Sequence, residues 1–269
     1  MTGLDLTRRR ELGQLVEDTW HLYGGNLRLF LTIALAIVIP TDLLVLGVGA
    51  GQLWHGYEED PNLGPTVLAA VLHLLVIQPL VTAACIAAVM SLGRAEEPSA
   101  GWSIARGFER WGAVLAAVLL GGLATLGGFI FFVIPGIWLA VALYFASQAV
   151  VAEGRSPIEA LRRSRELVRG QWWRVFGIGV LFTVAVGVFS GLISAGGQAI
   201  ADAADRQVFD LLGTMVADVL TVGFIAVAST LVFFDLRVRS EGAPPPPRWA
   251  PAGWEAPTPA QSPGSGRTS

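Results

Sequence analysis

Three ionisable residues lie in long apolar runs, where they are candidates for proton or ion chemistry: Asp42, His73 and Asp218. A charged aspartate at the centre of a membrane helix costs about 2.5–3.5 kcal/mol, so such residues are usually neutral, paired or functional. Asp42 follows Pro40 and lies about 21 Å along a helix from Arg28. It is the candidate for an ion-coupled site, with His73 or Asp218 as its partner. The alternative is that Asp42 hydrogen-bonds the Pro40 kink while His73 and Asp218 reach the outer interface.

A second group of residues has the chemistry to contact lipid headgroups. In segment 156–177, Ser156, Pro157 and Glu159 fit a helix start, and Gly170 is placed to end that helix. Arginine attracts anionic lipid at roughly 1 kcal/mol per residue, and tryptophan favours the headgroup level. The alternative is a charged connector docked on the helix bundle. The candidate interface residues are Arg162, Arg163, Arg165, Arg169, Trp172 and Trp173.

The remaining sequence contains no recognised catalytic arrangement. There are three histidines and one cysteine, and no Ser/His/Asp group, phosphate-binding loop or metal-ligand spacing. We therefore expect no enzyme, no cofactor, no metal and no nucleic-acid partner. The first hypothesis is a non-catalytic membrane scaffold or a module that binds lipids or a protein partner. The alternative is a transporter of small solutes or lipids with Asp42 in its pathway.

Composition predicts the class of fold that positions these residues. The 269 residues are 53% hydrophobic and 14% charged, against about 25% charged in soluble domains, and mean hydropathy is +0.59. About 20 apolar residues cross the hydrocarbon core of a bilayer. We predict an all-α polytopic membrane helical bundle with six spans, at about 28–50, 66–92, 112–134, 136–152, 175–199 and 213–234.

The fourth of these runs is the shortest. Residues 136–152 follow the third run through Pro135 and Gly136 without an intervening charged residue. Proline next to glycine is typical of a turn, so a tight hairpin is expected there. A re-entrant loop in place of a full span is the alternative.

The flanks and the charge distribution predict the orientation. Residues 1–27 read as a cytosolic amphipathic helix rather than a signal peptide, and 28–239 as the membrane domain. Residues 240–269 hold eight of the fifteen prolines, which indicates a disordered tail. One hypothesis is that the tail binds a cytosolic protein, and the alternative is a plain solvated tail. With the N-terminus inside, all of the 18 arginines except Arg206 fall on the cytosolic side. This asymmetry predicts cytoplasmic N- and C-termini in a bacterial plasma (inner) membrane.

The chain also shows signs of a threefold internal repeat. Residues 22–30 align with 167–176 on leucine, glycine and an amide before an apolar run, and 107–115 are a weaker third copy. Three units, each with a cytosolic helix and two spans, would be related by an axis along the membrane normal. The alternative is that any helix leading into a membrane looks similar.

Residues 131–177 carry a resemblance to a known family. The matching pieces are Pro135-Gly136-Ile137-Trp138, Glu153-Gly154, Pro157 with Glu159-Ala160-Leu161, and Gly170 with Trp173-Arg174. This pattern resembles the polytopic membrane domain fused to some bacterial glycerophosphoryl diester phosphodiesterases and its stand-alone relatives. In the fused proteins, hydrolysis belongs to a separate soluble barrel, for which this chain has no room. The resemblance therefore implies a membrane module without the enzyme.

Overall fold

The computed structural model describes residues 6, 9–54, 71, 73–94, 96–204 and 208–241, and within them every regular element is a helix. This confirms the predicted all-α fold. The side chains of 41–54, 73–74, 201–204, 208–212 and 214 lie outside the description. The α-helices are α1 (Leu12–Gly25), α2 (Leu27–Trp54), α4 (Gln78–Gly93), α5 (Ala100–Phe131), α6 (Val133–Leu143), α7 (Ala146–Glu153), α8 (Pro157–Val168), α9 (Trp172–Ala204) and α10 (Val208–Glu241), and a π-helical turn, His73–Ile77, leads into α4.

Five helical segments of the described chain are long and apolar enough to cross a membrane. A sixth is present if α1 and the start of α2 form one broken span, bent by 74° between Leu12–Gly25 and Leu27–Pro40. The multi-pass helical class predicted from composition is therefore confirmed. The five segments are Leu75–Gly93, Ala100–Phe131, Val133–Glu153, Trp172–Ile200 and Met215–Glu241.

The core lies around α4 and α10. Their most apolar windows are 67% and 78% buried, whereas those of α5 and α9 are only 22% and 6% buried. Helix α10 packs against α9, α4, α1 and α2, and its Phe233 and Leu231 are fully enclosed. A helix that is apolar all round yet uncovered by protein is typical of contact with lipid. The outer faces of α5 and α9 therefore have the character of lipid-facing surfaces.

Helix α1 lies along α10 rather than standing apart from the bundle. Its apolar stripe is buried at Leu15, Thr19 and Leu22. The Tyr23 hydroxyl donates a hydrogen bond of 2.9 Å to the Leu220 carbonyl. The sequence predicted the amphipathic helix of 1–27 but not its partner, because the stripe itself does not say what covers it.

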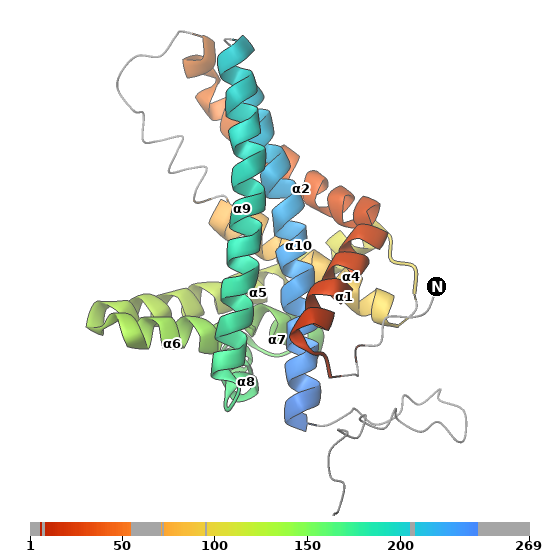
Figure 1. Ribbon diagram of the computed structural model, residues 1–269, viewed down its shortest axis with the longest axis vertical. Coiled ribbons are helices and arrows are strands. Elements are labelled where there is room, and N and C mark those ends of the chain that lie inside the picture. The colour runs from red at the N-terminus through yellow and green to blue at the C-terminus, as the bar shows by residue number, and fades with distance from the viewer. Residues whose placement is uncertain are drawn as a thin grey trace, which may run out of the picture.

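Helices α5 and α6 form an antiparallel hairpin that runs crosswise to the α9–α10 pair (Figure 1). The predicted turn at Pro135–Gly136 is wrong, because the break falls at Phe132, which is extended, and Pro135 lies in the first turn of α6. Proline is tolerated in a first turn, where its missing N–H costs no hydrogen bond. Gly136 instead permits close packing: a Cβ there would lie 2.4 Å from the Phe129 ring.

The tips of the two hairpins differ in polarity. Residues 130–134 form the α5–α6 tip and are all large and apolar, with exposed fractions from 62% at Val133 to 83% at Ile130. The α9–α10 connection instead carries Asp202, Asp205 and Arg206 in the sequence. Five adjacent apolar side chains are costly in water, so the α5–α6 tip is suited to hydrocarbon. The apolar tip and the crosswise direction of the two helix pairs fit the re-entrant alternative for 136–152, although Val133–Glu153 is long and apolar enough for a full span.

Two of the three repeat copies share a local structure. The chain breaks at Asn26 between α1 and α2, and at Gly170–Gln171 between α8 and α9. The third copy, 107–115, lies inside the continuous helix α5, which begins 12 residues before the span predicted at 112. The internal likeness therefore extends to two helix–turn–helix entries into apolar segments, and the third copy lacks the turn.

Candidate lipid interface

Helix α8 is bounded by two glycines in the left-handed conformation. Gly154 (φ 68°) precedes it and Gly170 (φ 82°) follows it, where residues with a Cβ would be strained. The Ser156 backbone N–H donates 3.1 Å to Glu159 Oε2, and the reciprocal bond completes the predicted capping box. The hydrogen bonds from the Ser156 side chain and backbone lower the pKa of the Glu159 carboxyl.

One face of α8 packs on the hairpin helices. Ala160, Ser164 and Leu167 are buried there. The Ser164 hydroxyl donates 2.8 Å to the Ala142 carbonyl and accepts 3.0 Å from the Phe145 N–H. These are backbone groups at the break between α6 and α7, so Ser164 satisfies polar groups that the break exposes. The apolar residues of this face therefore dock α8 on protein.

The opposite face of α8 presents arginines beside a tryptophan cluster. Arg162, Arg165 and Arg169 are exposed, and within the described residues none of the three forms a salt bridge. The Arg165 guanidinium lies 5.4 Å from the centre of the Trp138 ring. Trp172 Nε1 donates 3.4 Å to the Trp138 carbonyl, and Trp173 is 78% exposed. Five of the six predicted interface residues therefore share one surface, with Trp138 added by the structure.

A hollow of about 490 Å³ lies at the turn from α8 to α9. It opens beside the same surface, and its lining combines aromatic and cationic side chains. Such a combination suits an anionic group whose neighbours are apolar. The lining residues are Gly170, Gln171, Trp172, Trp173, Arg174 and Arg239.

Arg163 is separated from the other arginines of α8. Its side chain is 9% exposed, and it forms a bidentate pair with Glu153 at 3.0 Å and a further pair with Glu241 at the end of α10. Burial alone would lower the pKa of Arg163, but the hydrogen bonds to Glu153 and Glu241 raise it, so the guanidinium stays charged. Arg163 thus joins α7, α8 and α10 and does not face outward.

A second ionic cluster surrounds Asp235, which is fully buried in α10. Its carboxylate accepts 2.7 Å from the Arg10 backbone N–H, 3.1 Å from Arg174 and 2.9 Å from Arg239. Both Arg174 and Arg239 also donate 2.7 Å to the Arg10 carbonyl. The Arg10 guanidinium in turn pairs with Asp18 at 2.7 Å. Asp235 therefore ties the N-terminal segment to α9 and α10. It belongs to the C-terminal part of α10, the end of that helix nearer to α8 (Figure 1).

Sequence reasoning missed Asp235 and Glu153, the central carboxylates of the two ionic clusters. Each lies near the end of an apolar run, where a charge looks like an ordinary flanking residue. The signal that was available is that Asp235 is followed by Arg237 and Arg239. Its pairing with Arg174 and Arg10 joins residues far apart in the chain and has no local pattern.

Of the three intramembrane candidates, the structure describes the side chain of Asp218 alone. Asp42 lies within α2 after Pro40, and His73 begins the π-helical turn before α4. The side chains of both lie outside the description. Asp218 is partly buried in α10, and its carbonyl lies 3.3 Å from the Thr221 hydroxyl. Among the described residues, no group of three or more His, Cys, Asp or Glu could hold a metal ion.

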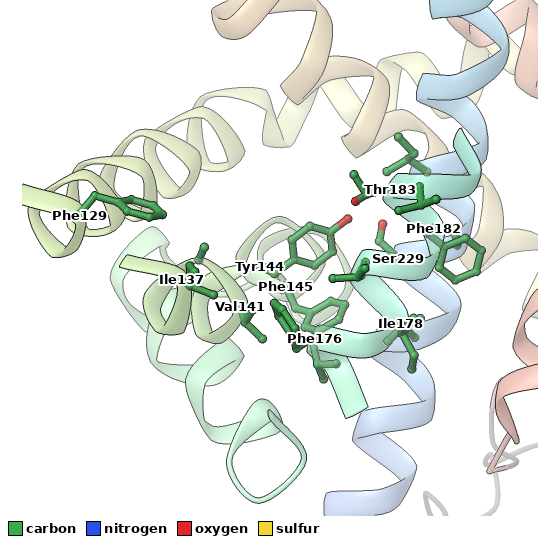
Figure 2. A pocket seen from close by; sticks show the side chains of 18 residues that line it. Phe129, Ile137, Val141, Tyr144, Phe145, Phe176, Ile178, Phe182, Thr183 and Ser229 are labelled. Carbon is green, nitrogen blue, oxygen red and sulfur yellow. The ribbon is translucent and has the colours of Figure 1, made fainter. Parts of the chain in front are cut away.

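An apolar groove lies between the hairpin and the α9–α10 pair (Figure 2). Its volume is about 350 Å³, and no charged residue lines it. Helix α6 contributes Ile137 and Val141, α9 contributes Phe176 and Ile178, and α10 contributes Ser229. The groove adjoins the tryptophan cluster, because Phe176 stacks on Trp172 with 5.1 Å between ring centres.

Comparison with known proteins gives one match, to a domain of unknown function, DUF7847, over residues 63–236. No curated protein and no solved structure matches the chain. This match does not test the resemblance to the phosphodiesterase membrane domains, which stays a prediction. The match covers the segment from before α4 to the cluster around Asp235, which includes α8, the groove and the apolar hairpin. On this match the chain belongs to the DUF7847 family.

Proposed function

We propose that this protein is a non-catalytic module of the plasma membrane that binds anionic lipid headgroups through the outer face of α8. The N-terminal segment, α8 and the end of α10 would lie at the cytosolic leaflet, where most of the arginines are found. Headgroup phosphates would be held by Arg162, Arg165 and Arg169, and Trp172 and Trp173 would mark the interface.

The observation that carries this proposal is the division of the α8 arginines into two kinds. Arg163 forms salt bridges with carboxylates, whereas Arg162, Arg165 and Arg169 are exposed beside tryptophans. Guanidinium groups are well suited to phosphate because they offer a planar fork of donors. A charged connector docked only on protein would need carboxylates opposite these three arginines, and the described residues supply none within salt-bridge distance.

The two ionic clusters support a scaffold role for the same surface. Arg163 fixes α8 to α7 and α10, and Asp235 fixes the N-terminal segment to α9 and α10. Buried ion pairs of this kind favour one arrangement of the helix ends. The headgroup surface would thus be rigid, and lipid binding would not require it to be ordered first.

The experiment compares full-length protein in nanodiscs of neutral lipid with and without an anionic phospholipid. Native mass spectrometry of the released protein reports how much anionic lipid stays bound. The test variant is Arg162→Gln, Arg165→Gln and Arg169→Gln combined, and we expect retention to fall by about tenfold or more, at roughly 1 kcal/mol per arginine. The matched control is a triple variant of exposed residues elsewhere: Arg94→Gln, Arg106→Gln and Arg28→Gln.

Equal retention by the wild type and the α8 triple variant would refute the headgroup role. Loss in both triple variants would also refute it, because it would mean that any surface arginine contributes equally. Salt sharpens the comparison, since a headgroup contact exposed to water weakens as ionic strength rises.

A further inference from the structure

The apolar groove contains three hydroxyl groups that the lipid interface does not use. Tyr144, Thr183 and Ser229 come from the α6–α7 break, α9 and α10, and they turn their hydroxyls toward the same part of the groove (Figure 2). In the part of the chain that the structure describes, the hydroxyls of Tyr144 and Thr183 have no hydrogen-bond partner. The Ser229 hydroxyl accepts 2.9 Å from Gln148 Nε2 and donates 3.1 Å to the Ala226 carbonyl.

An unpaired hydroxyl is unfavourable on a surface that faces hydrocarbon, because lipid chains offer no hydrogen-bond acceptor. A threonine in a helix commonly donates its hydroxyl to the carbonyl four residues earlier, as Thr221 and Thr230 do at 2.7 and 2.6 Å. The Thr183 hydroxyl makes no such described bond. The neighbours of Thr183 on α9 are exposed and apolar, at Val180, Leu181 and Val184. The groove therefore opens toward lipid and presents free donors inside an apolar lining.

We propose that this groove binds a neutral lipophile whose apolar body carries a carbonyl group, with the hydroxyls of Tyr144 and Thr183 donating to that carbonyl. The volume of about 350 Å³ falls in the range of small-molecule sites, which are mostly apolar with a few placed polar groups. A carbonyl fits because it only accepts hydrogen bonds, and both free groups can donate.

The lining also excludes the anionic headgroups that would bind at α8. No charged residue reaches the groove, so a phosphate or carboxylate there would be buried without a partner. Thr183 lies about 16 Å further along α9 than Trp172, so a headgroup held at the tryptophans would not reach it. The groove and the α8 surface are therefore two sites with different ligand chemistry, and either can exist without the other.

The test uses full-length protein in nanodiscs of neutral phosphatidylcholine and equilibrium binding of two radiolabelled probes. One is a short-tailed isoprenoid quinone, which carries ring carbonyls, and the other is an isoprenoid hydrocarbon of the same carbon number. We expect the quinone to bind about tenfold tighter. Tyr144→Phe and Thr183→Val keep the side-chain shapes and remove the donors, and each should weaken the quinone about fivefold while leaving the hydrocarbon unchanged.

A second pair of variants tests the place of binding. Gly179 lines the groove, and a Cβ there would meet nothing within 4 Å, so Gly179→Leu adds bulk to the groove lining from an open position. Gly187, two turns further on α9, is equally open but does not line the groove, and Gly187→Leu is the control. We expect only Gly179→Leu to abolish binding of the quinone.

The proposal is overturned if quinone and hydrocarbon bind equally, if Tyr144→Phe and Thr183→Val together bind the quinone like the wild type, or if Gly179→Leu has no effect. The Arg162, Arg165 and Arg169 triple variant should bind the quinone normally. Failure of the α8 proposal and failure of this one are therefore separate results.

Discussion

Arg163 binds Glu153 across the turn at Gly154, with both oxygens of the carboxylate accepting hydrogen bonds of 3.0 Å from the guanidinium. From helical spacing alone, the expected ion-pair partner of Arg163 is Glu159, four residues earlier on α8. Glu159 is occupied by the Ser156 N–H, and Arg163 faces inward, where Glu153 and Glu241 meet it. Of the four arginines at positions 162, 163, 165 and 169, Arg163 is thus structural, and the other three form no described salt bridge.

Removing the charge at position 163 should destabilise the fold, whereas the same change at 162 should not. Arg163→Gln removes the bidentate partner of Glu153, which keeps its pair with Arg155, so we expect a loss of about 2 kcal/mol. Arg162→Gln changes an exposed residue that forms no described salt bridge and should cost less than about 0.5 kcal/mol. Unfolding in mixed detergent micelles measures both variants, and equal stability would contradict the structural role of Arg163.

Neutralising Asp235 should release the N-terminal segment. Asp235→Asn removes the charge that holds Arg174 and Arg239 and weakens the bond from the Arg10 N–H. Hydrogen–deuterium exchange across residues 9–25 should then rise markedly, with a loss of stability of about 3 kcal/mol or more. As a control, Glu109→Gln breaks an exposed pair with Arg106, worth about 1 kcal/mol at most. Unchanged protection of 9–25 in Asp235→Asn would show that the cluster does not hold this segment.

The close contact of α5 with α6 should tolerate no side chain at Gly136. Gly136→Val places a Cβ 2.4 Å from the Phe129 ring, and overpacking of this kind costs about 1–3 kcal/mol. Gly122→Val is the matched control on the same hairpin, since a Cβ at Gly122 meets nothing within 4 Å. Thermal stability in detergent compares the two. If both variants unfolded at the wild-type temperature, the hairpin would not be packed through Gly136.

The hairpin tip should reside in hydrocarbon. A nitroxide is attached at Phe132→Cys in a Cys85→Ala background. Molecular oxygen should relax this label more than a water-soluble nickel chelate does, because the residues around position 132 are apolar and exposed. A label at Glu97→Cys, exposed in the connection between α4 and α5, provides the aqueous reference. Relaxation at 132 that is dominated by the nickel chelate would instead place the tip in water, as expected of two full spans.

The sequence was sufficient for the helical class because apolar runs in lipid leave few other solutions. The predicted spans at 175–199 and 213–234 fall within α9 and α10, and the capping box at Ser156 and the stop at Gly170 are present. These features are local, so the residues that cause them are adjacent in the chain.

What the sequence did not give is the pairing of distant groups. The Asp235 cluster joins residues 10, 174 and 239, and the hydroxyls of the groove come from three separate helices. The same limit explains the hairpin turn: Pro135 and Gly136 read locally as a turn, yet Gly136 is needed for contact with Phe129. Contacts between residues far apart in the chain determine both the ion pairs and the position of the hairpin turn. The periodicity of apolar residues carries no information about such contacts.

The most direct test of the account is the side of the membrane on which α8 lies. In intact cells, a membrane-impermeant maleimide is applied to Arg162→Cys in the Cys85→Ala background, before and after the membrane is made permeable. An α8 surface that binds headgroups of the inner leaflet predicts labelling only after permeabilisation. Full labelling of position 162 in intact cells would contradict it.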